Sequence, residues 1–239
     1  MIPRLSHPES TPEIVQSFLA ELRQSSFSGD IQHDYGTRLI TSTDNSIYQV
    51  LPQAVVFPKN AGDIEVVLHL TAQQKFCQSI KITARGGGTG TNGQSLTKGI
   101  VLDCSRYMNR ILEVNIKQGW VRVEPGVVLD QLNEHLVPHS VFFAPNLSPS
   151  NRATIGGMVN TDACGKGSRI YGRTSDHVLE LSCVLSNGET LESVPLDENN
   201  LSTYKQKPGV AGEVFKVVDQ IVLEKADLID EVFPKMSRF

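Results

Sequence analysis

The sequence predicts an α+β protein, and three features of the chain support that prediction. Short apolar runs that suit buried strands lie at 54–57, 80–83 and 100–103. Two stretches with turn residues at their centres, 110–123 and 178–194, predict β-hairpins. Apolar residues at helical spacing predict amphipathic helices among these strands. The chain has 239 residues, enough for one large domain or two small ones.

The composition describes an ordinary soluble globular protein, with 39% hydrophobic and 20% charged residues. The net charge of −4 and the lack of a basic stripe argue against a nucleic-acid-binding surface. The N-terminus lacks the apolar core of a signal peptide, and no apolar run approaches transmembrane length. We therefore expect a cytoplasmic protein, with peripheral association at the inner membrane face as the alternative.

The cysteines do not form a metal-binding pattern. They are widely scattered and none lies in a C-x-x-C arrangement, which argues against zinc and iron–sulfur sites: Cys77, Cys104, Cys164 and Cys183. Disulfides are not expected in a reducing compartment. We predict no metal site, and packed thiols except at Cys164, which lies inside a glycine-containing motif.

The N-terminal part predicts one helix followed by irregular structure. Thr11 is a candidate N-cap, Pro12 suits the first turn, and apolar residues on one face extend the helix over 12–24. The segment 30–53 is rich in polar turn residues, so we expect an irregular surface segment there. We assign residues 1–50 to an N-terminal helix and lead-in.

A strand–helix–strand unit follows the lead-in. The strand at 54–57 precedes Asn60, which can cap a helix that continues to about Lys75. A second strand at 80–83 leads into a glycine-rich loop, and a third strand follows at 100–103. The loop therefore joins two buried strands and is not a free surface linker.

That loop is the most distinctive stretch of the chain. Five of the eight residues 86–93 are glycine, and the others are short and polar. Glycine costs a helix about 1 kcal/mol relative to alanine, but it suits a backbone that must expose N–H groups, some at positive φ. Successive N–H groups form an anion-binding concavity, to which the hydroxyls of Thr89 and Thr91 can add donors. The loop therefore predicts a phosphate or pyrophosphate site.

Two familiar phosphate-binding patterns match the letters of the loop but not its context. Gly88-x-Gly90-x-x-Gly93 satisfies the dinucleotide-binding fingerprint, which needs a helix between two parallel strands. Such a crossover takes about a dozen residues or more, and only residues 94–99 separate Gly93 from the next strand. A P-loop is also excluded, because Gln94 stands where the phosphate-binding lysine belongs.

A second glycine motif lies in the next part of the chain. After a hairpin with its turn at Gln118-Gly119 and a helix over 128–136, the segment 153–165 reads Ala-Thr-Ile-Gly-Gly-Met-Val-Asn-Thr-Asp-Ala-Cys-Gly. It predicts a short helix over 154–163 whose N-terminal N–H groups point unpaired at a negative ligand. Its small residues would let the backbone press against a flat ring system.

The C-terminal part predicts a second hairpin and one long helix. Asn187-Gly188 is a strong signal for a two-residue turn. The amphipathic pattern over 212–232 predicts a single long helix. Arg173 and His177 lie in a polar turn before the hairpin, where we favour a positioning role over catalysis.

The ordered pair of glycine motifs resembles the FAD-binding domain of FAD-linked oxidases, the vanillyl-alcohol-oxidase or p-cresol-methylhydroxylase (PCMH) type. Arg-Gly-Gly-Gly-Thr-Gly-Thr at 85–91 is followed about sixty residues later by the motif at 153–165. Within that group the chain is most similar to the D-2-hydroxyacid dehydrogenases (glycolate oxidase, D-lactate and D-2-hydroxyglutarate dehydrogenases). The resemblance, which extends from about Tyr48 to the C-terminus, implies two α+β subdomains with FAD between them.

The resemblance also implies the domain organisation. Residues 51–239 would form a PCMH-type FAD-binding domain, with one subdomain at about 51–105 and a second at about 106–239. The family's later Glu-Gly-Thr-Leu-Gly-type motif has no good match here; the nearest run, 207–212, lacks the threonine. We therefore expect an N-terminal fragment that is C-terminally truncated within this domain.

Carried over residue by residue, the resemblance implies an FAD site made by both motifs. The glycine loop would wrap the pyrophosphate through Arg85, Gly86, Gly87, Gly88, Thr89, Gly90, Thr91 and Asn92. The second motif and the loop before it would contact the flavin side through Ser148, Thr154, Ile155, Gly156, Gly157, Asn160, Thr161, Ala163, Cys164 and Gly165. Family members that tether the flavin covalently use a histidine or cysteine. The glycine loop has no histidine, so we expect non-covalent FAD.

The reaction implied by the resemblance is oxidation of a D-2-hydroxyacid, of the D-lactate, D-2-hydroxyglutarate or glycolate type, to the 2-oxoacid. The flavin accepts a hydride and passes its electrons to an acceptor that the sequence leaves open. In the family the base and the substrate ligands lie in a C-terminal substrate domain. We therefore predict no catalytic residue in this chain and an inactive fragment on its own. The alternatives are a flavin-binding subunit that needs a separate partner, and a nucleotide-binding protein without redox chemistry.

Overall fold

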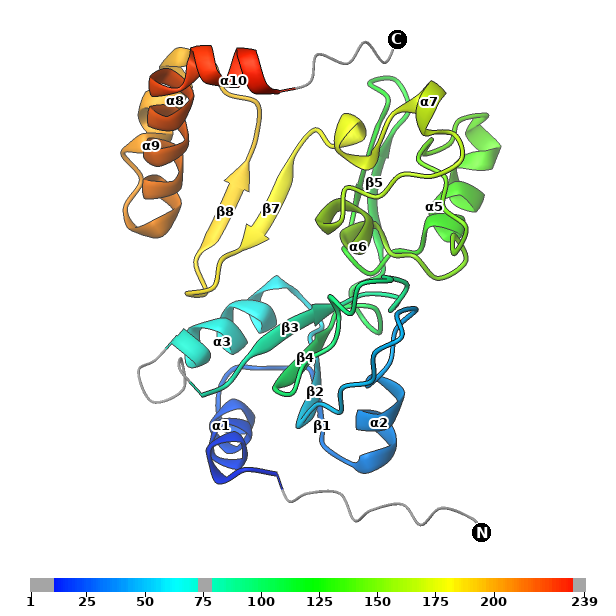
Figure 1. Ribbon diagram of the computed structural model, residues 1–239, viewed down its shortest axis with the longest axis vertical. Helices are drawn as coiled ribbons and strands as arrows, with labels where there is room; N and C mark the ends of the chain where they lie inside the picture. The colour runs from blue at the N-terminus through cyan, green and yellow to red at the C-terminus, as the bar shows by residue number, and fades with distance from the viewer. Residues whose placement is uncertain (1–10, 73–78, 234–239) are drawn as a thin grey trace.

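The computed structural model describes residues 11–72 and 79–233. Figure 1 shows a lower part built on a four-stranded sheet and, above it, a compact part at the right and a hairpin with three helices at the left. Helices and strands are mixed along the chain, as an α+β fold requires. The chain enters through the lower part and leaves through the helices at the top.

The lower part is a sheet with the strand order β1-β2-β4-β3. β1 runs antiparallel to β2, whereas β2 and β3 each run parallel to β4. The strands are β1 (Asp30–Gln32), β2 (Ala54–Phe57), β3 (Ile82–Arg85) and β4 (Ile100–Asp103). The central strands β2 and β4 are buried along their whole length, which explains why they are continuous apolar runs in the sequence.

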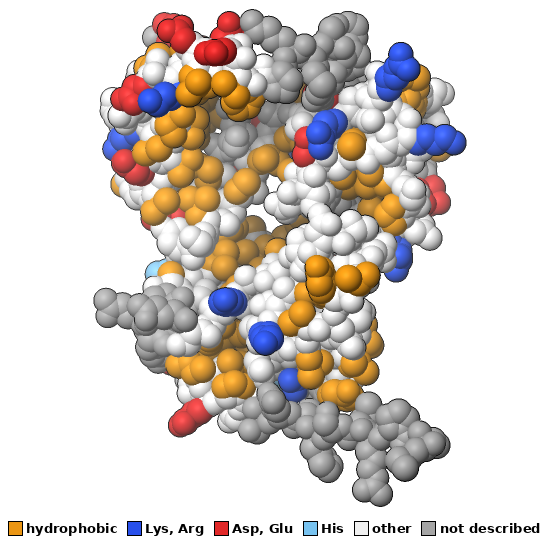
Figure 2. Space-filling model, in the orientation of Figure 1, with side chains coloured by type: hydrophobic (Ala, Val, Ile, Leu, Met, Phe, Trp, Pro, Cys, Tyr) orange, Lys and Arg blue, Asp and Glu red, His pale blue; other side chains and the backbone are white. Residues whose placement is uncertain are grey.

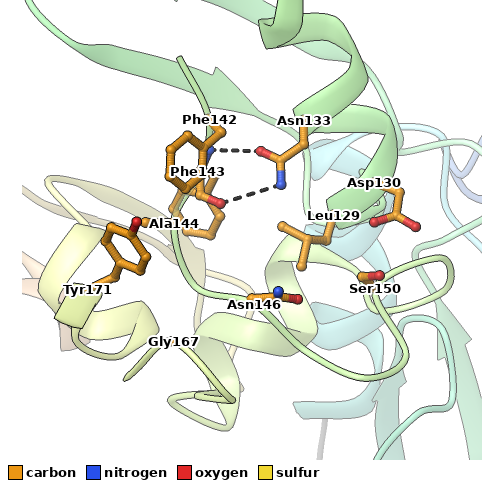
Figure 3. A pocket seen from close by; sticks show the side chains of 10 residues that line it. All are labelled: Leu129, Asp130, Asn133, Phe142, Phe143, Ala144, Asn146, Ser150, Gly167 and Tyr171. Atoms are coloured by element: carbon orange, nitrogen blue, oxygen red, sulfur yellow. Dashed lines mark hydrogen bonds between the residues drawn. The ribbon is translucent and has the colours of Figure 1, made fainter. Parts of the chain in front are cut away.

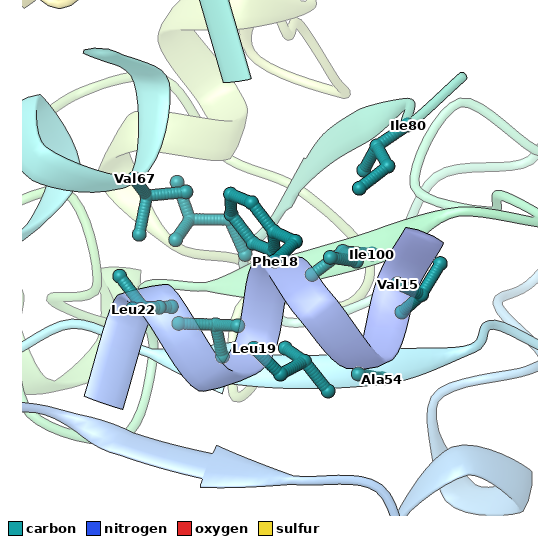
Figure 4. Packing of buried hydrophobic residues seen from close by; sticks show 10 residues of the cluster. Val15, Phe18, Leu19, Leu22, Ala54, Val67, Ile80 and Ile100 are labelled. Atoms are coloured by element: carbon teal, nitrogen blue, oxygen red, sulfur yellow. The ribbon is translucent and has the colours of Figure 1, made fainter. Parts of the chain in front are cut away.

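The main hydrophobic core lies between this sheet and the helices α1 (Glu13–Gln24) and α3 (Ala61–Ala72). Figure 4 shows the side chains of α1, among them Phe18 and Leu22, pointing into the core that Val67 of α3 and Ile100 of β4 also fill. Phe18 and Ile100 are fully buried. The predicted helices at 12–24 and after Asn60 are confirmed up to Ala72, and the rest of the second prediction lies outside the described residues.

The prediction that the whole segment 30–53 is irregular was wrong for residues 30–40, whereas residues 41–53 contain no helix or strand. The segment contains β1, which extends the sheet, and α2 (Tyr35–Ile40), which Asp34 caps by accepting a hydrogen bond from Thr37 N at 3.0 Å. Arg38 of α2 is buried, and its Nε donates to the carbonyl of Pro52 at 2.6 Å. Elements of three and six residues are too short to show a clear hydrophobic period.

The glycine loop joins β3 to the parallel strand β4. β3 begins at Ile82, two residues later than predicted, and no helix lies between the two strands. The exclusion of a helical dinucleotide-binding crossover is therefore confirmed. The loop emerges at the top of the sheet, where the lower part meets the compact upper part (Figure 1).

The compact upper part packs a hairpin against short helices. The predicted hairpin is confirmed as β5 (Ile111–Asn115) and β6 (Trp120–Val123), with Gly119 at a φ of 73° in its turn. The helices are α5 (Leu129–Leu136), α6 (Ile155–Asn160) and α7 (Ser168–Tyr171), with 3-10 turns η1 (Val137–His139) and η2 (Thr174–His177). α6 ends at Asn160 rather than at residue 163, and Asp162 soon after it has a φ of 43° that no helix permits.

The remaining part differs from the prediction in three ways. The hairpin of β7 (Leu181–Val184) and β8 (Thr190–Ser193) turns through three residues, because Leu185 N donates to Glu189 O at 2.8 Å. The predicted long helix is two helices, α9 (Gly209–Glu224) and α10 (Ala226–Val232), separated at Lys225. α8 (Glu198–Lys205) precedes them and was not predicted, since its low amphipathicity leaves no clear apolar stripe.

The outer face of α9 and α10 is apolar and exposed. Figure 2 shows hydrophobic side chains gathered over this region, at the upper left of the molecule. The exposed side chains include Val218, Ile221, Val222, Leu223, Leu228 and Val232. A face of this kind is usual where a helix packs against further polypeptide.

Candidate functional site

The two glycine motifs, far apart in the sequence, touch each other in the structure. A β-carbon at Gly86 would lie 2.1 Å from Oγ1 of Thr154, and one at Gly87 would lie 1.8 Å from the carbonyl oxygen of Arg152. No real side chain tolerates such distances, so glycine is required at both positions for the loop to reach the start of α6. The contact joins the lower part of the molecule to the compact upper part.

The backbone of the glycine loop offers a continuous row of hydrogen-bond donors. From Gly86 to Thr91, no amide N–H donates to an acceptor in the described part of the chain. Gly88 and Gly93 have φ angles of 62° and 75°, which confirms the expected positive φ within the loop. Unpaired backbone N–H groups need partners, and a run of them in a turn of this kind forms a concavity for an anion.

Arg85, predicted to bind the cofactor, has its guanidinium on protein atoms in the structure. Its Nη2 donates to the carbonyl of Thr43 at 2.8 Å, and its Nη1 to Oγ of Ser95 at 3.2 Å. Burial lowers the pKa of the guanidinium, and the nearby carboxylates of Asp103 and Asp44 act in the opposite direction. Arg85 therefore ties the loop to Thr43, in the segment between α2 and β2.

The segment between α2 and β2 also contacts the glycine loop. Asn45 N donates to the carbonyl of Gly90 at 3.1 Å, and Oγ of Ser95 donates to Asp44 Oδ2 at 3.3 Å. A β-carbon at Gly93 would lie 3.0 Å from the ring of Tyr48. The segment that the sequence left as an irregular lead-in is therefore part of the wall around the loop.

The N-terminus of α6 does not present the unpaired N–H groups that the sequence predicted. Ile155 N donates to Val127 O at 2.8 Å and Gly156 N donates to Pro125 O at 2.9 Å. Gly157 N donates to Oγ1 of Thr154, the N-cap, at 3.4 Å. These donors are occupied because the segment before α5 crosses the start of α6, which sequence spacing alone does not show.

The other predicted residues of the second motif form a compact, largely self-bonded segment. Asn160 Nδ2 donates to Gly156 O at 3.0 Å, and Thr161 Oγ1 to Gly157 O at 2.9 Å. The carbonyl of Ala163 accepts from Oγ1 of buried Thr174 at 2.6 Å. The need for one glycine of this motif is explained by close packing of the backbone and does not require contact with a ligand.

That glycine is Gly165, where a β-carbon would lie 1.8 Å from the carbonyl oxygen of Asn146. The contact places the end of the motif against the loop that carries Ser148, which is exposed. Cys164 is exposed as well, whereas burial and the charge of Asp103 raise the pKa of the Cys104 thiol to about 12. Of these two thiols, Cys164 is the more exposed to solvent.

Arg173 and His177 are held by neighbouring protein groups, which agrees with a positioning role in the turn. Arg173 Nε lies 2.9 Å from Asp162 Oδ2, and its Nη2 donates to Asp162 O at 3.2 Å. His177 Nε2 lies 2.6 Å from the carbonyl of Tyr171. These contacts fix the turn that follows the second motif.

Two residues at the loop were missed by the sequence analysis, Asn45 and Arg152. Asn45 bonds to Gly90 as described, and its Oδ1 accepts from Arg152 Nη2 at 3.4 Å. Neither residue belongs to a recognisable motif. Arg152 could have been noticed only as an arginine two residues before Thr154, and nothing in its own sequence indicates which way its side chain points.

A separate pocket of about 360 Å³ opens in the compact upper part, and two of its lining residues, Leu129 and Asn146, contact the second glycine motif. Figure 3 shows Phe142, Asn133 and Tyr171 around it. Asn133 is used by the fold, since its Oδ1 accepts from Phe143 N at 2.7 Å. No residue predicted to bind the cofactor lines the pocket, so its shape does not identify the site.

Residues 11–72 and 79–233 contain no group of three or more His, Cys, Asp or Glu side chains placed to hold a metal ion. None of their helices is long and apolar enough to cross a membrane.

The family whose description is "FAD binding domain" matches residues 52–193, which include both glycine motifs and the strands from β2 to β8. The chain belongs to this family. Solved structures agree on the fold of this FAD binding domain: alkyldihydroxyacetonephosphate synthase has a TM-score of 0.64 at 20% identity, covering 80% of this chain and 36% of that one. Physcomitrella patens BBE-like 1 has a TM-score of 0.63 at 20% identity, covering 75% and 37%. The predicted PCMH-type α+β fold is confirmed.

Curated relatives of this FAD binding domain are dehydrogenases and oxidases of 2-hydroxyacids. D-2-hydroxyglutarate dehydrogenase of Pseudomonas putida is 56% identical over 92% of this chain and 22% of its own length. The enzyme of the same name from Escherichia coli is 50% identical over the whole chain and 23% of its own length. Glycolate oxidase subunit GlcD of Bacillus subtilis is 31% identical over 65% of this chain. The chain thus spans under a quarter of the first two relatives.

Proposed function

We propose that this chain is the FAD-binding portion of a flavin-dependent oxidoreductase that oxidises a D-2-hydroxyacid to the 2-oxoacid. The observation that carries the proposal is the unbroken row of unpaired N–H groups from Gly86 to Thr91, pressed against the second motif at Thr154. Such a row suits the diphosphate of a dinucleotide. Membership in the FAD binding domain family identifies FAD as the dinucleotide.

The described residues fit FAD at the loop better than at α6. The loop has donors to spare, whereas the first N–H groups of α6 are bonded within the protein. We therefore assign the diphosphate to the backbone of 86–91, with Asn92 beside it. The flavin side is assigned to the exposed groups of the second motif, namely Gly157, Asn160, Thr161 and Cys164, and to Ser148. Thr154, Ile155, Gly156, Ala163 and Gly165 would shape the site through packing.

We propose that FAD is held without a covalent bond. The glycine loop contains no histidine or cysteine to which a flavin could be attached. Bound FAD supplies the acceptor for the hydride that leaves the hydroxyacid carbon. The chain's own share of the work is to bind and orient the cofactor, because Arg173 and His177 are already engaged by protein groups.

We propose D-2-hydroxyglutarate as the substrate, because the names of similar relatives support it. Two relatives at 50% identity or more carry the name D-2-hydroxyglutarate dehydrogenase, and each is more than four times as long as the region matched here. We place the substrate-binding groups and the base in the part of the relatives that this chain does not span. We retain the cytoplasm as the proposed location, since the described helices include none that could span a membrane.

The test is a titration of the purified chain with FAD, followed by the quenching or shift of flavin fluorescence. Saturable binding of about one FAD per chain, which added ATP or NAD does not displace, supports the proposal. A folded chain that binds ATP or NAD at least as well as FAD would instead favour a nucleotide-binding protein without redox chemistry. A folded chain that binds none of them would overturn the assignment of the glycine loop.

A further inference from the structure

Arg152 contacts the glycine loop through its backbone, and its side chain contacts Asn45, which is bonded to the loop. Its carbonyl oxygen lies against Gly87, at a place where no β-carbon could stand. Its guanidinium reaches Oδ1 of Asn45 at 3.4 Å, and Asn45 is itself hydrogen-bonded to Gly90. Arg152 is therefore connected to the loop directly at Gly87 and through Asn45 at Gly90. Both glycines lie in the stretch whose N–H groups have no acceptor in the described chain.

Arg152 is also the nearby cation that remains available for a ligand. The guanidinium of Arg85 is committed to Thr43 and Ser95. The long bond to Asn45 is weak by its distance, and Arg152 is exposed. A planar guanidinium beside a row of backbone donors suits two phosphate groups, since it can donate two parallel hydrogen bonds to their oxygens.

The acidic groups around the loop do not compete for this arginine. Asp44 Oδ2 accepts from Oγ of Ser95 at 3.3 Å. Asp103 Oδ1 accepts from the N–H and the hydroxyl of Ser105 at 2.8 and 2.6 Å. Neither carboxylate forms a hydrogen bond or ion pair with Arg152, and its guanidinium has no ion-pair partner among the described residues.

We propose that Arg152 is a diphosphate-binding residue: its guanidinium pairs with the diphosphate of the bound dinucleotide and closes the cradle that the N–H groups of 86–91 form. This rests on the proposed function in one respect, that the dinucleotide is FAD. The loop supplies neutral donors, and Arg152 supplies the positive charge that a dianion needs in a site partly removed from water.

The side chain of Arg152 can be changed without disturbing the contact between the motifs. The contact with Gly87 is made by the backbone carbonyl, which any residue at 152 retains. The side chain is exposed and carries a single weak hydrogen bond. Surface substitutions of this kind change stability little. A loss of ligand binding in the variant would therefore report on the guanidinium itself.

The experiment compares the parent chain with Arg152→Gln, Arg152→Lys and Arg169→Gln. Arg169 on α7 is exposed and provides a control for the loss of one positive charge from the same part of the molecule. The dissociation constants of FAD, ADP and riboflavin are measured at low and high salt. We expect Arg152→Gln to weaken FAD and ADP roughly tenfold or more at low salt, with less effect at high salt. Arg152→Lys should recover part of the loss, and Arg169→Gln should match the parent.

Riboflavin, which has no phosphate, separates charge pairing from ring packing. Equal weakening of riboflavin and FAD by Arg152→Gln would show that the side chain packs on the ring, and would overturn the proposal. Equal FAD affinity in the parent and Arg152→Gln would overturn it as well. A parent that binds ADP through Arg152 but does not bind FAD would leave the diphosphate assignment standing while the proposed function fails. A parent that binds neither ligand would remove both.

Discussion

Gly86 and Thr154 are in van der Waals contact across the junction of the two glycine motifs, and a β-carbon at Gly86 would lie 2.1 Å from the Thr154 hydroxyl oxygen. Thr154 is 2% exposed, and its hydroxyl also caps α6. The first glycines of the loop are therefore needed to bring the loop and the second motif together. Substitutions at these glycines therefore disturb the contact between the two parts of the molecule, whether or not they also disturb ligand binding.

A valine at Gly87 should separate the two motifs. The new β-carbon would stand 1.8 Å from the Arg152 carbonyl oxygen, which is backbone and cannot move aside cheaply. Overpacking of this kind costs about 1–3 kcal/mol. We expect Gly87→Val to lower the melting temperature and to abolish FAD binding together. A thermal shift assay and an FAD titration measure both effects, and a variant with the parent's stability and FAD affinity would show that the loop does not dock on residue 152.

Gly90 should report on the ligand instead of on the fold. A β-carbon there would meet the amide of Gln94, 2.2 Å from Nε2, and the end of a flexible side chain can swing away. We expect Gly90→Ala to change stability by about 0.5 kcal/mol or less while it weakens FAD. Gln94→Ala is the matched control, because it opens the same space without adding a β-carbon to the loop. Unchanged FAD affinity in Gly90→Ala would mean that the ligand does not approach this residue.

The neighbouring glycines of α6 should behave differently from each other. A β-carbon at Gly156 would lie 2.6 Å from Cβ and 2.9 Å from the carbonyl oxygen of Pro125, so Gly156→Ala should destabilise the chain by about 1–3 kcal/mol. Gly157 is exposed and meets only Oγ1 of Thr154, at 3.2 Å. Gly157→Val should keep the melting temperature and weaken FAD.

Urea unfolding with an FAD titration of both variants checks the pair. If Gly157→Val binds FAD as tightly as the parent does, the exposed side of α6 does not face the cofactor. If Gly156→Ala is as stable as the parent, the close packing of α6 on Pro125 is not a constraint.

The sequence predicted the strands and helices that carry a clear hydrophobic period or a turn signal, and missed those that do not. The apolar runs of β2 and β4 and the amphipathic face of α1 are properties of consecutive residues. β1 is three residues long and exists because it pairs with β2, where Asp30 lies opposite Phe57, 27 residues later. A pairing between segments so far apart has no local signal.

The candidate site shows the same division. The donor row of the glycine loop follows from residue types alone, since consecutive glycines and short polar residues expose their own N–H groups. The state of the α6 N-terminus does not follow, because its donors are taken by the carbonyls of Pro125 and Val127, about thirty residues earlier in the sequence. Asn45 and Arg152 likewise owe their place at the loop to contacts between distant segments.

Stability should depend on pH through Glu124. Burial opposes ionisation of this carboxyl, but hydrogen bonds from the backbone N–H, Nε and Nη2 of Arg110 outweigh it and lower the pKa of Glu124 below its ordinary 4.5. A carboxyl with a lowered pKa stabilises the fold above its ordinary pKa, and the contribution is lost as the pH falls through the lowered value. Glu124→Gln should therefore be less stable than the parent at neutral pH by about 1–2 kcal/mol.

Urea unfolding at a series of pH values checks this prediction. The two stability curves should run apart near neutrality and converge in acid below pH 4.5, where the parent's carboxyl becomes protonated. A constant difference at all pH values would show that the substitution acts through packing alone.

The chain with bound FAD should not oxidise a 2-hydroxyacid by itself. Oxidation needs a base within hydrogen-bond reach of the substrate hydroxyl and a cation for its carboxylate. Near the second motif, His177 Nε2 lies 2.6 Å from Tyr171 O, and Arg173 is paired with Asp162 at 2.9 Å, so both are already engaged. We expect no bleaching of the flavin band when the FAD-loaded chain is mixed anaerobically with D-2-hydroxyglutarate, D-lactate or glycolate.

Dithionite, which reduces flavin without a substrate site, is the control that the bound FAD can be bleached. Bleaching by any of the three acids at more than a trace rate would show that a base and a carboxylate ligand are present in this chain, and His177→Ala and Arg173→Ala would then be the first variants to test.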